Sequence, residues 1–275
     1  PLIECLPETE WPYDWLMGWR DVCRGSDERT VIASVGPRTA VGHTAPLMLP
    51  VDRTLPLEGL LANLCAFVLD FTARQKISGA HLTYAYLEQL PVLSPDKYAA
   101  PAPWLADAPL ATWIRPRVLE LTYTSHELAP FARHLGDEGP PFVWDDERRF
   151  LMRAELDAAY FHLYGLSEAE AALVLDSFRA FRNKKPELFA RTREEILAVY
   201  RAMAKAAESG VRYTHPELTP APGLGQRHEP GRSPLTRLPV RADEKAAGEQ
   251  PPQPEGPEPR APEGEDPDGQ LGFWG

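Results

Sequence analysis

The chain has few of the residues that form disulfides, and it has no long hydrophobic run. Its 275 residues include 3 Cys, and no two of them form a Cys-x-x-Cys pair. So few cysteines, odd in number, argue against a disulfide scaffold and against a thiolate zinc site. The longest apolar run, residues 60–69, contains Asn63 and stops at Asp70, about half of what a bilayer span needs. We therefore predict a cytoplasmic protein with no membrane segment and no signal peptide.

The sequence motifs of common catalytic centres are also missing. The chain has neither G-x-G-x-x-G nor G-x-x-x-x-G-K-[ST], and it has no G-x-S-x-G turn. Its 7 His residues show neither H-x-x-x-H nor H-E-x-x-H spacing, so a metal site has no local support. Motifs alone therefore predict no catalytic, cofactor-binding or metal-binding residue. Because the chain opens on Pro1, we expect either a removed initiator Met or the downstream piece of a longer protein.

Proline, glycine and negative charge gather towards the C-terminal end. Residues 216–275 contain 13 of the 30 Pro and 9 of the 19 Gly, and their 11 acidic and 6 basic residues contribute −5 to the net charge of −11. A segment with so few large apolar residues cannot offset the entropy cost of folding. We predict a disordered acidic tail over 216–275. The remaining charge of −6 on residues 1–215 still permits a basic face.

The N-terminal part predicts a small α/β module over residues 1–98, within an α+β fold. Residues 30–35 are rich in β-branched side chains and end at Gly36-Pro37, which indicates a strand followed by a turn. Residues 39–49 predict a second, irregular strand. The aromatic residues expected to pack under this sheet are Trp11, Trp15, Trp19 and Trp104.

Helical periodicity begins after Pro56. Apolar residues at three- and four-residue spacing predict one helix over 57–76, ended by Ser78-Gly79. Residues 81–87 predict a strand or a short helix. We expect a surface linker over 99–112 and a helical support domain over 113–215.

Helix-capping residues mark the helices of that support domain. The Thr124/Glu127 and Ser167/Glu170 pairs have capping-box spacing, and the second is expected to open a helix that reaches about Phe181. Asp145 is expected to cap a helix that ends near Gly165, and residues 187–208 predict the last helix.

Several segments follow one another in an order that matches a known family. They are Trp19-Arg20-Asp21-Val22, residues 27–33, Val41-Gly42-His43-Thr44, and residues 71–79, 87–92, 120–124, 154–159 and 163–166. Together they resemble the C-terminal half of adenine-specific DNA methyltransferases. The closest resemblance is to the large fused methylases of type IIG restriction–modification and phage-defence systems. It covers about residues 10–205.

The resemblance implies that catalysis and target recognition belong to different halves of the protein. In that family the upstream half binds S-adenosylmethionine and carries an Asn-Pro-Pro-Tyr/Phe motif that holds the flipped adenine. Neither occurs here, because Gly139-Pro140-Pro141-Phe142 has no amide or carboxylate before its prolines. The resemblance therefore implies a target-recognition half without a catalytic residue or cofactor site. Its partners would be double-stranded DNA and a catalytic methyltransferase half or subunit that binds S-adenosylmethionine. The methyltransferase activity would belong to the whole protein or assembly.

The module offers the hydrogen-bond donors that reading DNA requires. We expect Arg29, Arg74 and Lys76 to contact phosphates. The residues expected near the groove are Gln75, Ser78, His81 and Thr83. The predicted DNA-binding set is completed by Arg20, Arg24, Arg38 and Gly79, the last because glycine permits close backbone approach or a positive φ.

Each of these interpretations has a plainer alternative. Arg74 and Lys76 also fit a solvated helix C-terminus, and His81 fits a hydrogen-bonded histidine beside a turn. For Arg29 the alternative is an ion pair with Asp27 or Asp21. For the whole chain it is a non-catalytic adaptor, or a degenerate remnant of such a system, whose acidic tail discourages nucleic acid.

Overall fold

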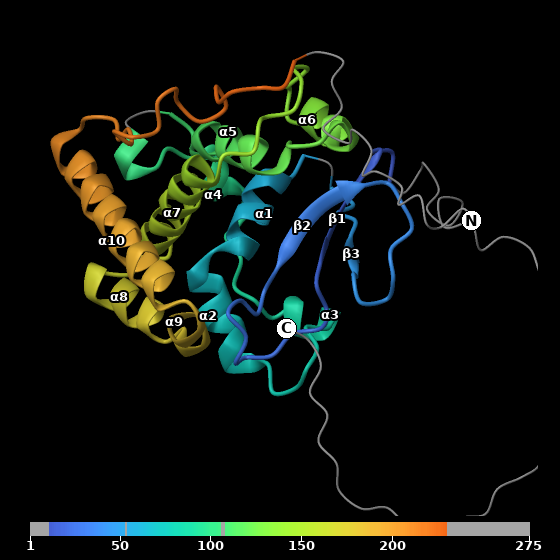
Figure 1. The fold of residues 1–275 in the computed structure, drawn as a ribbon, viewed down its shortest axis with the longest axis horizontal. Coiled ribbons are helices and arrows are strands. Elements are labelled where there is room, and N and C mark those ends of the chain that lie inside the picture. The colour runs from blue at the N-terminus through green and yellow to red at the C-terminus, as the bar shows by residue number, and fades with distance from the viewer. Residues whose placement is uncertain (1–10, 53, 106–107, 230–275) are drawn as a thin grey trace, which may run out of the picture. The chain divides into compact units, whose positions relative to one another are not determined.

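A strand rich in tryptophan lies at the centre of a small antiparallel sheet in the computed structural model, which describes residues 11–52, 54–105 and 108–229 (Figure 1). This strand, β1 (Trp15–Trp19), lies between β2 (Ala33–Pro37) and β3 (Leu47–Met48). Its odd-numbered side chains face the core, and Trp15 and Trp19 are 0% and 2% exposed. The predicted burial of the tryptophans is confirmed. β1 itself was not predicted, because it lacks the β-branched residues that mark a strand.

Helices are the other regular elements of the described chain, so the predicted α+β class is confirmed. In chain order they are α1 (Leu57–Cys65), α2 (Phe67–Lys76), α3 (Tyr84–Leu87), α4 (Pro95–Ala99), the 3-10 turn η2 (Pro103–Leu105), α5 (Leu110–Thr122), the 3-10 turn η3 (His126–Leu128), α6 (Ala129–His134), α7 (Asp146–Leu163), α8 (Glu168–Asp176), α9 (Arg179–Lys184) and α10 (Pro186–Ser209). In Figure 1, α7, α8 and α10 lie on the far side of α1 and α2 from the sheet. None of these described helices is long and apolar enough to cross a membrane.

The single helix predicted over 57–76 is broken in two at Ala66, whose backbone is extended (φ −76°, ψ 144°). Tertiary contacts take over the backbone groups at the break. The Phe67 N–H donates to the Asp157 carboxylate (2.7 Å), and the Arg29 guanidinium donates to the Cys65 carbonyl. Both partners lie far away in sequence, which is why periodicity did not reveal the break.

Local capping residues behave largely as predicted in the helical part. Asp145 accepts from the Arg148 N–H at the start of α7, and Ser167 and Glu170 form the capping box of α8. The helix after Ser167 ends at Asp176, before the predicted Phe181, and α9 follows as a separate helix. The first capping box was placed one residue early, because Ser125 caps the turn η3.

One hydrophobic core runs from Trp11 to Tyr213 and includes both predicted regions. The segment 99–112, predicted as a surface linker, contributes to this core because Trp104 and Leu110 are 1% and 0% exposed. A buried ion pair joins α5 to α7, with Arg117 Nε 2.8 Å from the carboxylate of Glu155. No break in the core coincides with residues 98–113.

The first part of the predicted tail packs against this body. Leu218 is buried, and Arg227 forms hydrogen bonds to the Asp137 carboxylate (2.9 Å) and to the Pro140 carbonyl (2.7 Å). The predicted start at residue 216 is therefore too early, since pairing with residues 137–143 holds residues 226–228 in place. Residues 230–275 lie outside the described part of the chain.

The buried Asp157 makes a pH-dependent contribution to stability. Burial raises its pKa to about 6, although Arg29 and the Phe67 N–H oppose the shift. The folded state therefore holds this proton more tightly than the unfolded chain, and stability falls as the pH rises from about 4 to 7. The difference of about two pKa units corresponds to about 3 kcal/mol.

We predict that Asp157→Asn, which keeps an acceptor for the Phe67 N–H, is more stable than the wild type at neutral pH by up to about 3 kcal/mol. The two proteins should converge near pH 4, where Asp157 is protonated. Urea unfolding at both pH values measures this. A variant that is less stable than the wild type at neutral pH would contradict the prediction.

Candidate nucleic-acid interface

Two segments that are far apart in sequence lie side by side at the end of the sheet. The Cys23 N–H donates to the Ala80 carbonyl (2.9 Å), and the Leu82 N–H donates to the Asp21 carbonyl (2.7 Å). Between them, Val22 and His81 form an antiparallel bridge. We call residues 20–24 and 75–83 together the paired-segment surface.

Side chains alternate between the surface and the core along residues 20–24, and in the second segment Leu82 is buried between the exposed His81 and Thr83. Cys23 and Leu82 are 1% and 0% exposed and point into the core. Their neighbours on the opposite face are exposed, and these are Arg20, Val22, Arg24, Gly79, His81 and Thr83. The antiparallel pairing therefore presents donors from two distant segments on one face.

The C-terminal end of α2 extends this face. Gln75 and Lys76 are exposed, and Lys76 has no hydrogen bond or ion pair to another described residue. Ser78 lies 3.3 Å from the hydroxyl of Tyr86. Gly79 has open space around it and no positive φ, so neither backbone strain nor a close contact explains that glycine.

A buried carboxylate holds the surface together from beneath. Asp70 of α2 is 0% exposed, and it accepts hydrogen bonds from Arg29 Nε (2.8 Å), Arg74 Nε (3.0 Å) and the Thr30 N–H (3.0 Å). Arg74 also donates to the carbonyls of Gly25, Asp27 and Glu28. This cluster fastens the loop that follows Arg24 to α2.

The same contacts correct the roles proposed for Arg29 and Arg74. Both guanidiniums are turned towards Asp70, and each also packs on an aromatic ring, with Cζ 4.1 Å from the centres of the Phe67 and Phe178 rings respectively. We therefore do not retain them as phosphate contacts. The alternative for Arg29 was an ion pair with Asp27 or Asp21. Arg29 does form an ion pair, but its partner is Asp70.

Arg38 also lies away from the paired-segment surface. Its guanidinium donates to the carbonyls of Trp11 (2.8 Å) and Tyr13 (3.2 Å), and its N–H donates to the Asp14 carbonyl, beyond the opposite end of β1. The structure thus brings together eight of the predicted residues: Arg20, Arg24, Gln75, Lys76, Ser78, Gly79, His81 and Thr83.

Nearby acidic side chains are largely engaged. Asp21 lies 2.6 Å from Nδ1 of His81. Asp27 accepts from the Arg24 N–H (3.0 Å) and lies 3.5 Å from the Arg20 guanidinium. Arg24 and Lys76 are therefore the cations of this surface that have no carboxylate partner among the described residues, and Arg20 is exposed beside Asp27.

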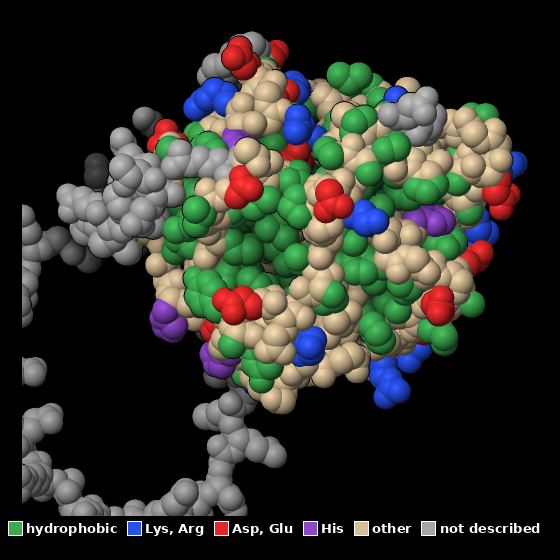
Figure 2. All heavy atoms as spheres, turned by 180° about the vertical axis from the view of Figure 1, so that it is seen from behind, with side chains coloured by type: hydrophobic (Ala, Val, Ile, Leu, Met, Phe, Trp, Pro, Cys, Tyr) green, Lys and Arg blue, Asp and Glu red, His purple; other side chains and the backbone are tan. Residues whose placement is uncertain are grey.

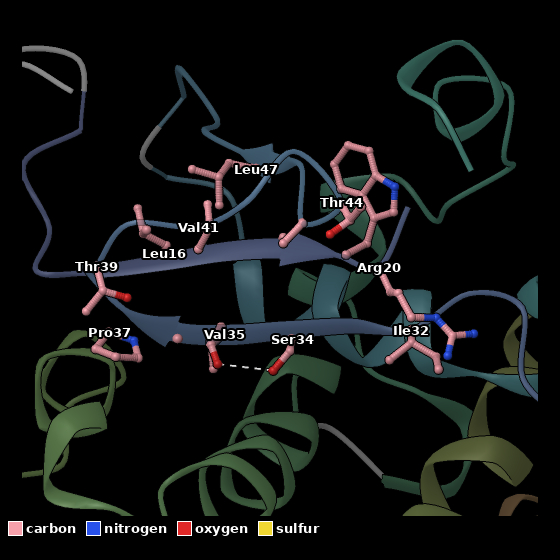
Figure 3. Close-up of a pocket in the computed structure, with 14 residues that line it drawn as sticks. Leu16, Arg20, Ile32, Ser34, Val35, Pro37, Thr39, Val41, Thr44 and Leu47 are labelled. Atoms are coloured by element: carbon pink, nitrogen blue, oxygen red, sulfur yellow. Dashed lines mark hydrogen bonds between the residues drawn. The ribbon is translucent and has the colours of Figure 1, made fainter. Parts of the chain in front are cut away.

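An apolar hollow of about 400 Å³ continues from Arg20 across the outer face of the sheet. Figure 3 shows Leu16, Val41 and Leu47 gathered along it, with Arg20 and Ile32 at one end. In Figure 2 hydrophobic side chains line a depression on the side of the molecule that carries the sheet. Gly18 is required beneath it, since an added Cβ would come within 2.5 Å of the Pro46 carbonyl oxygen.

Sequence reasoning missed both Asp70 and the hollow. The sequence could have indicated the role of Asp70, because this residue precedes Arg74 by four positions on a helix face that is otherwise apolar, which is the spacing of an ion pair within a helix. For the hollow there was no comparable signal, since its walls come from three strands and the segment 39–45.

We predict that Asp70→Asn lowers the free energy of unfolding by about 3–5 kcal/mol, because it leaves two guanidiniums without their shared carboxylate. The control is Asp176→Asn, which breaks an ion pair to Arg193 in which the two side chains are 41% and 36% exposed. That change should cost at most about 1 kcal/mol. Urea unfolding measures both, and equal losses would contradict the assigned role of Asp70.

Metal binding and similarity to other proteins give no further guide to this surface. In residues 11–52, 54–105 and 108–229, no group of three or more His, Cys, Asp or Glu side chains is arranged to hold a metal ion. No family model matches this chain, and no curated protein or solved structure matches it.

Proposed function

We propose that the chain is the DNA target-recognition portion of an adenine-specific, S-adenosylmethionine-dependent DNA methyltransferase of a restriction–modification or phage-defence system. The catalytic half and its cofactor would belong to another part of the protein or to a partner subunit. The observation that carries the proposal is the pairing of residues 20–24 with residues 78–83. It places Arg20, Arg24, His81 and Thr83 on one exposed face.

The chemistry of that face suits double-stranded DNA. Arginine and lysine bind phosphates and thereby fix the register of a protein on the duplex. Amide, hydroxyl and imidazole groups donate to and accept from base edges in the major groove. In this assignment Arg20, Arg24 and Lys76 contact phosphates. The groups assigned to the base edges are Gln75, Ser78, His81 and Thr83.

The support beneath the face favours a recognition role. Readout of bases requires side chains on a rigid base, because a displacement of about 1 Å breaks a hydrogen bond. The Asp70 cluster ties the loop 24–30 to α2, and the Trp19 indole N–H donates to the Leu82 carbonyl (2.7 Å) from inside the core. Both segments are therefore held from beneath, and their outer side chains remain exposed.

A second candidate is a non-catalytic adaptor that binds a protein. The apolar hollow favours it, because Leu16, Ile32, Val41 and Leu47 offer a surface for an apolar side chain rather than for a phosphate. The two candidates make opposite predictions for DNA binding.

We predict that Lys76→Ala weakens binding of the chain to a duplex oligonucleotide for all sequences alike, and that it reduces the slope of log K against log salt by about one. Arg24→Ala should act in the same way. The matched control is Lys205→Ala, which removes an exposed lysine from α10. Fluorescence anisotropy between about 50 and 200 mM salt measures both the affinity and the slope.

Two results would overturn the assignment. If the wild-type chain shows no salt-dependent affinity for duplex DNA, the recognition role fails and the adaptor is favoured. If Lys76→Ala and Lys205→Ala have equal effects, DNA binds elsewhere on the chain. Far-UV circular dichroism of each variant excludes unfolding as the cause.

A further inference from the structure

Two arginines of α7 lie beside a pair of cavities that the paired-segment surface does not touch. The larger cavity, about 320 Å³, is lined by Arg149, Arg153 and Asp157 together with apolar side chains. The smaller, about 220 Å³, has Arg153 and Asp157 in its wall as well. Arg153 and Asp157 therefore separate two hollows that adjoin each other.

Within the described residues, neither of these two arginines has the carboxylate partner that other arginines of the helical part have. Arg117 pairs with Glu155, Arg148 with Glu120, and Arg227 with Asp137. Arg153 is exposed and has no hydrogen bond or ion pair to any other described residue. Its guanidinium is thus available to a ligand.

Arg149 is held in place, yet it is incompletely satisfied. Its guanidinium stacks on Trp144, with Cζ 3.6 Å from the ring centre, and it donates to the Leu121 carbonyl (2.8 Å). Its buried Nε has no hydrogen-bond partner among the described residues. A fixed guanidinium with an unused donor is preorganised for an anion.

The two positive charges also oppose each other. Arg149 and Arg153 are four residues apart on α7 and so lie on the same face, where like charges destabilise a helix. Burial lowers the pKa of Arg149, and the charge of Arg153 lowers it further, while Asp146 and Glu120 act in the opposite direction. An anion bound between them would relieve this repulsion.

The other charged groups around the cavities do not supply that anion. Asp157 is buried and accepts the Phe67 N–H. In the smaller cavity Glu28 pairs with Lys185 (2.9 Å), and Arg29 is held by Asp70. Among the described residues, no carboxylate therefore forms an ion pair with Arg149 or Arg153, although Glu120 and Asp146 act on Arg149 and Asp157 acts on Arg153 from a greater distance.

The walls of the larger cavity indicate more than a bare anion. Leu61, Val118, Leu121 and Leu156 line it, and its volume lies at the lower end of the range for small-molecule sites. A ligand that fills it needs a compact apolar body as well as an anionic group. The carboxylate of Asp157 adds a polar group that can bond to an amine on that body.

We propose that this site binds a nucleotide, with the phosphate between Arg149 and Arg153 and the base against the leucine wall of the larger cavity. The nucleotide is either a free nucleoside monophosphate or an unpaired nucleotide of a nucleic-acid strand, because both present the same phosphate and base. The site shares no residue with the paired-segment surface, so it does not rest on the proposed function.

Calorimetric titration with each of the four deoxynucleoside monophosphates in turn tests the proposal. We expect at least one to saturate the wild-type chain with a dissociation constant of about 1 mM or tighter. Arg153→Ala should weaken it about tenfold or more. The matched control, Arg212→Ala, removes another exposed arginine and should leave the affinity unchanged. Because Arg153 forms no hydrogen bond or ion pair with a described residue, Arg153→Ala and Arg212→Ala should have similar midpoints of thermal unfolding.

Three further ligands sharpen the outcome. Inorganic phosphate and the unphosphorylated nucleosides should each bind more weakly than the best monophosphate. A single-stranded oligonucleotide with a 5′-phosphate distinguishes the two sources, since tighter binding of the strand than of the monophosphate assigns nucleic acid and the reverse assigns the free nucleotide.

The proposal is overturned by any of three results. No monophosphate saturates the chain, Arg153→Ala and Arg212→Ala bind equally, or phosphate alone binds as tightly as the best nucleotide. None of these would alter the effect expected for Lys76→Ala on duplex binding, so the two proposals fail separately.

Discussion

The buried carboxylate of Asp70 is the constraint on which the candidate interface depends. It is fully enclosed, and it joins Arg74 of its own helix to Arg29 and the Thr30 backbone, which lie about forty residues earlier in the sequence. A carboxylate in this position is costly to bury unless each oxygen is hydrogen-bonded, and here both oxygens are. The loop before β2 therefore cannot leave α2 without exposing or orphaning charged groups.

Under the proposed function, this constraint accounts for exposed basic side chains on a chain whose net charge is negative. The arginines closest to Asp70 are part of the fold, whereas Arg24 and Lys76 project from the segments that the cluster holds in place, and Arg20 projects beside Asp27. The net charge of −11 does not distinguish paired from unpaired basic residues. The charges available to a ligand are those without a partner in the fold. By this criterion Arg153 also differs from the paired arginines of the helical part.

Local features of the sequence predicted the helical part well. Asp145 and the Ser167/Glu170 pair form hydrogen bonds with backbone groups within three residues, so these caps can be predicted from the sequence without knowledge of the fold. The break at Ala66 could not be predicted from the local sequence, because Asp157, which accepts a hydrogen bond from the Phe67 N–H, lies ninety residues further along the chain. The strand β1 was missed for a related reason: pairing on both sides makes it a strand, although its composition does not.

The candidate site was predicted in part. Arg20 and residues 75–79 belong to segments that the resemblance singled out, whereas Arg24, His81 and Thr83 lie next to those segments. The fold pairs residues 20–24 with residues 78–83. The inward turn of Arg29 and Arg74 depends on the burial of Asp70, and burial is a property of the assembled core rather than of a motif. Whether the eight remaining residues bind DNA stays a prediction.

Hydrogen–deuterium exchange of the Cys23 and Leu82 amides tests most directly whether Asp70 assembles the interface. Both amides donate across the paired segments, to Ala80 and Asp21. The account predicts slow exchange in the wild type and exchange about tenfold faster or more in Asp70→Asn, with the amides of α7 and α10 protected in both proteins. Fast exchange at Cys23 and Leu82 in the wild type, or no change in the variant, would contradict it.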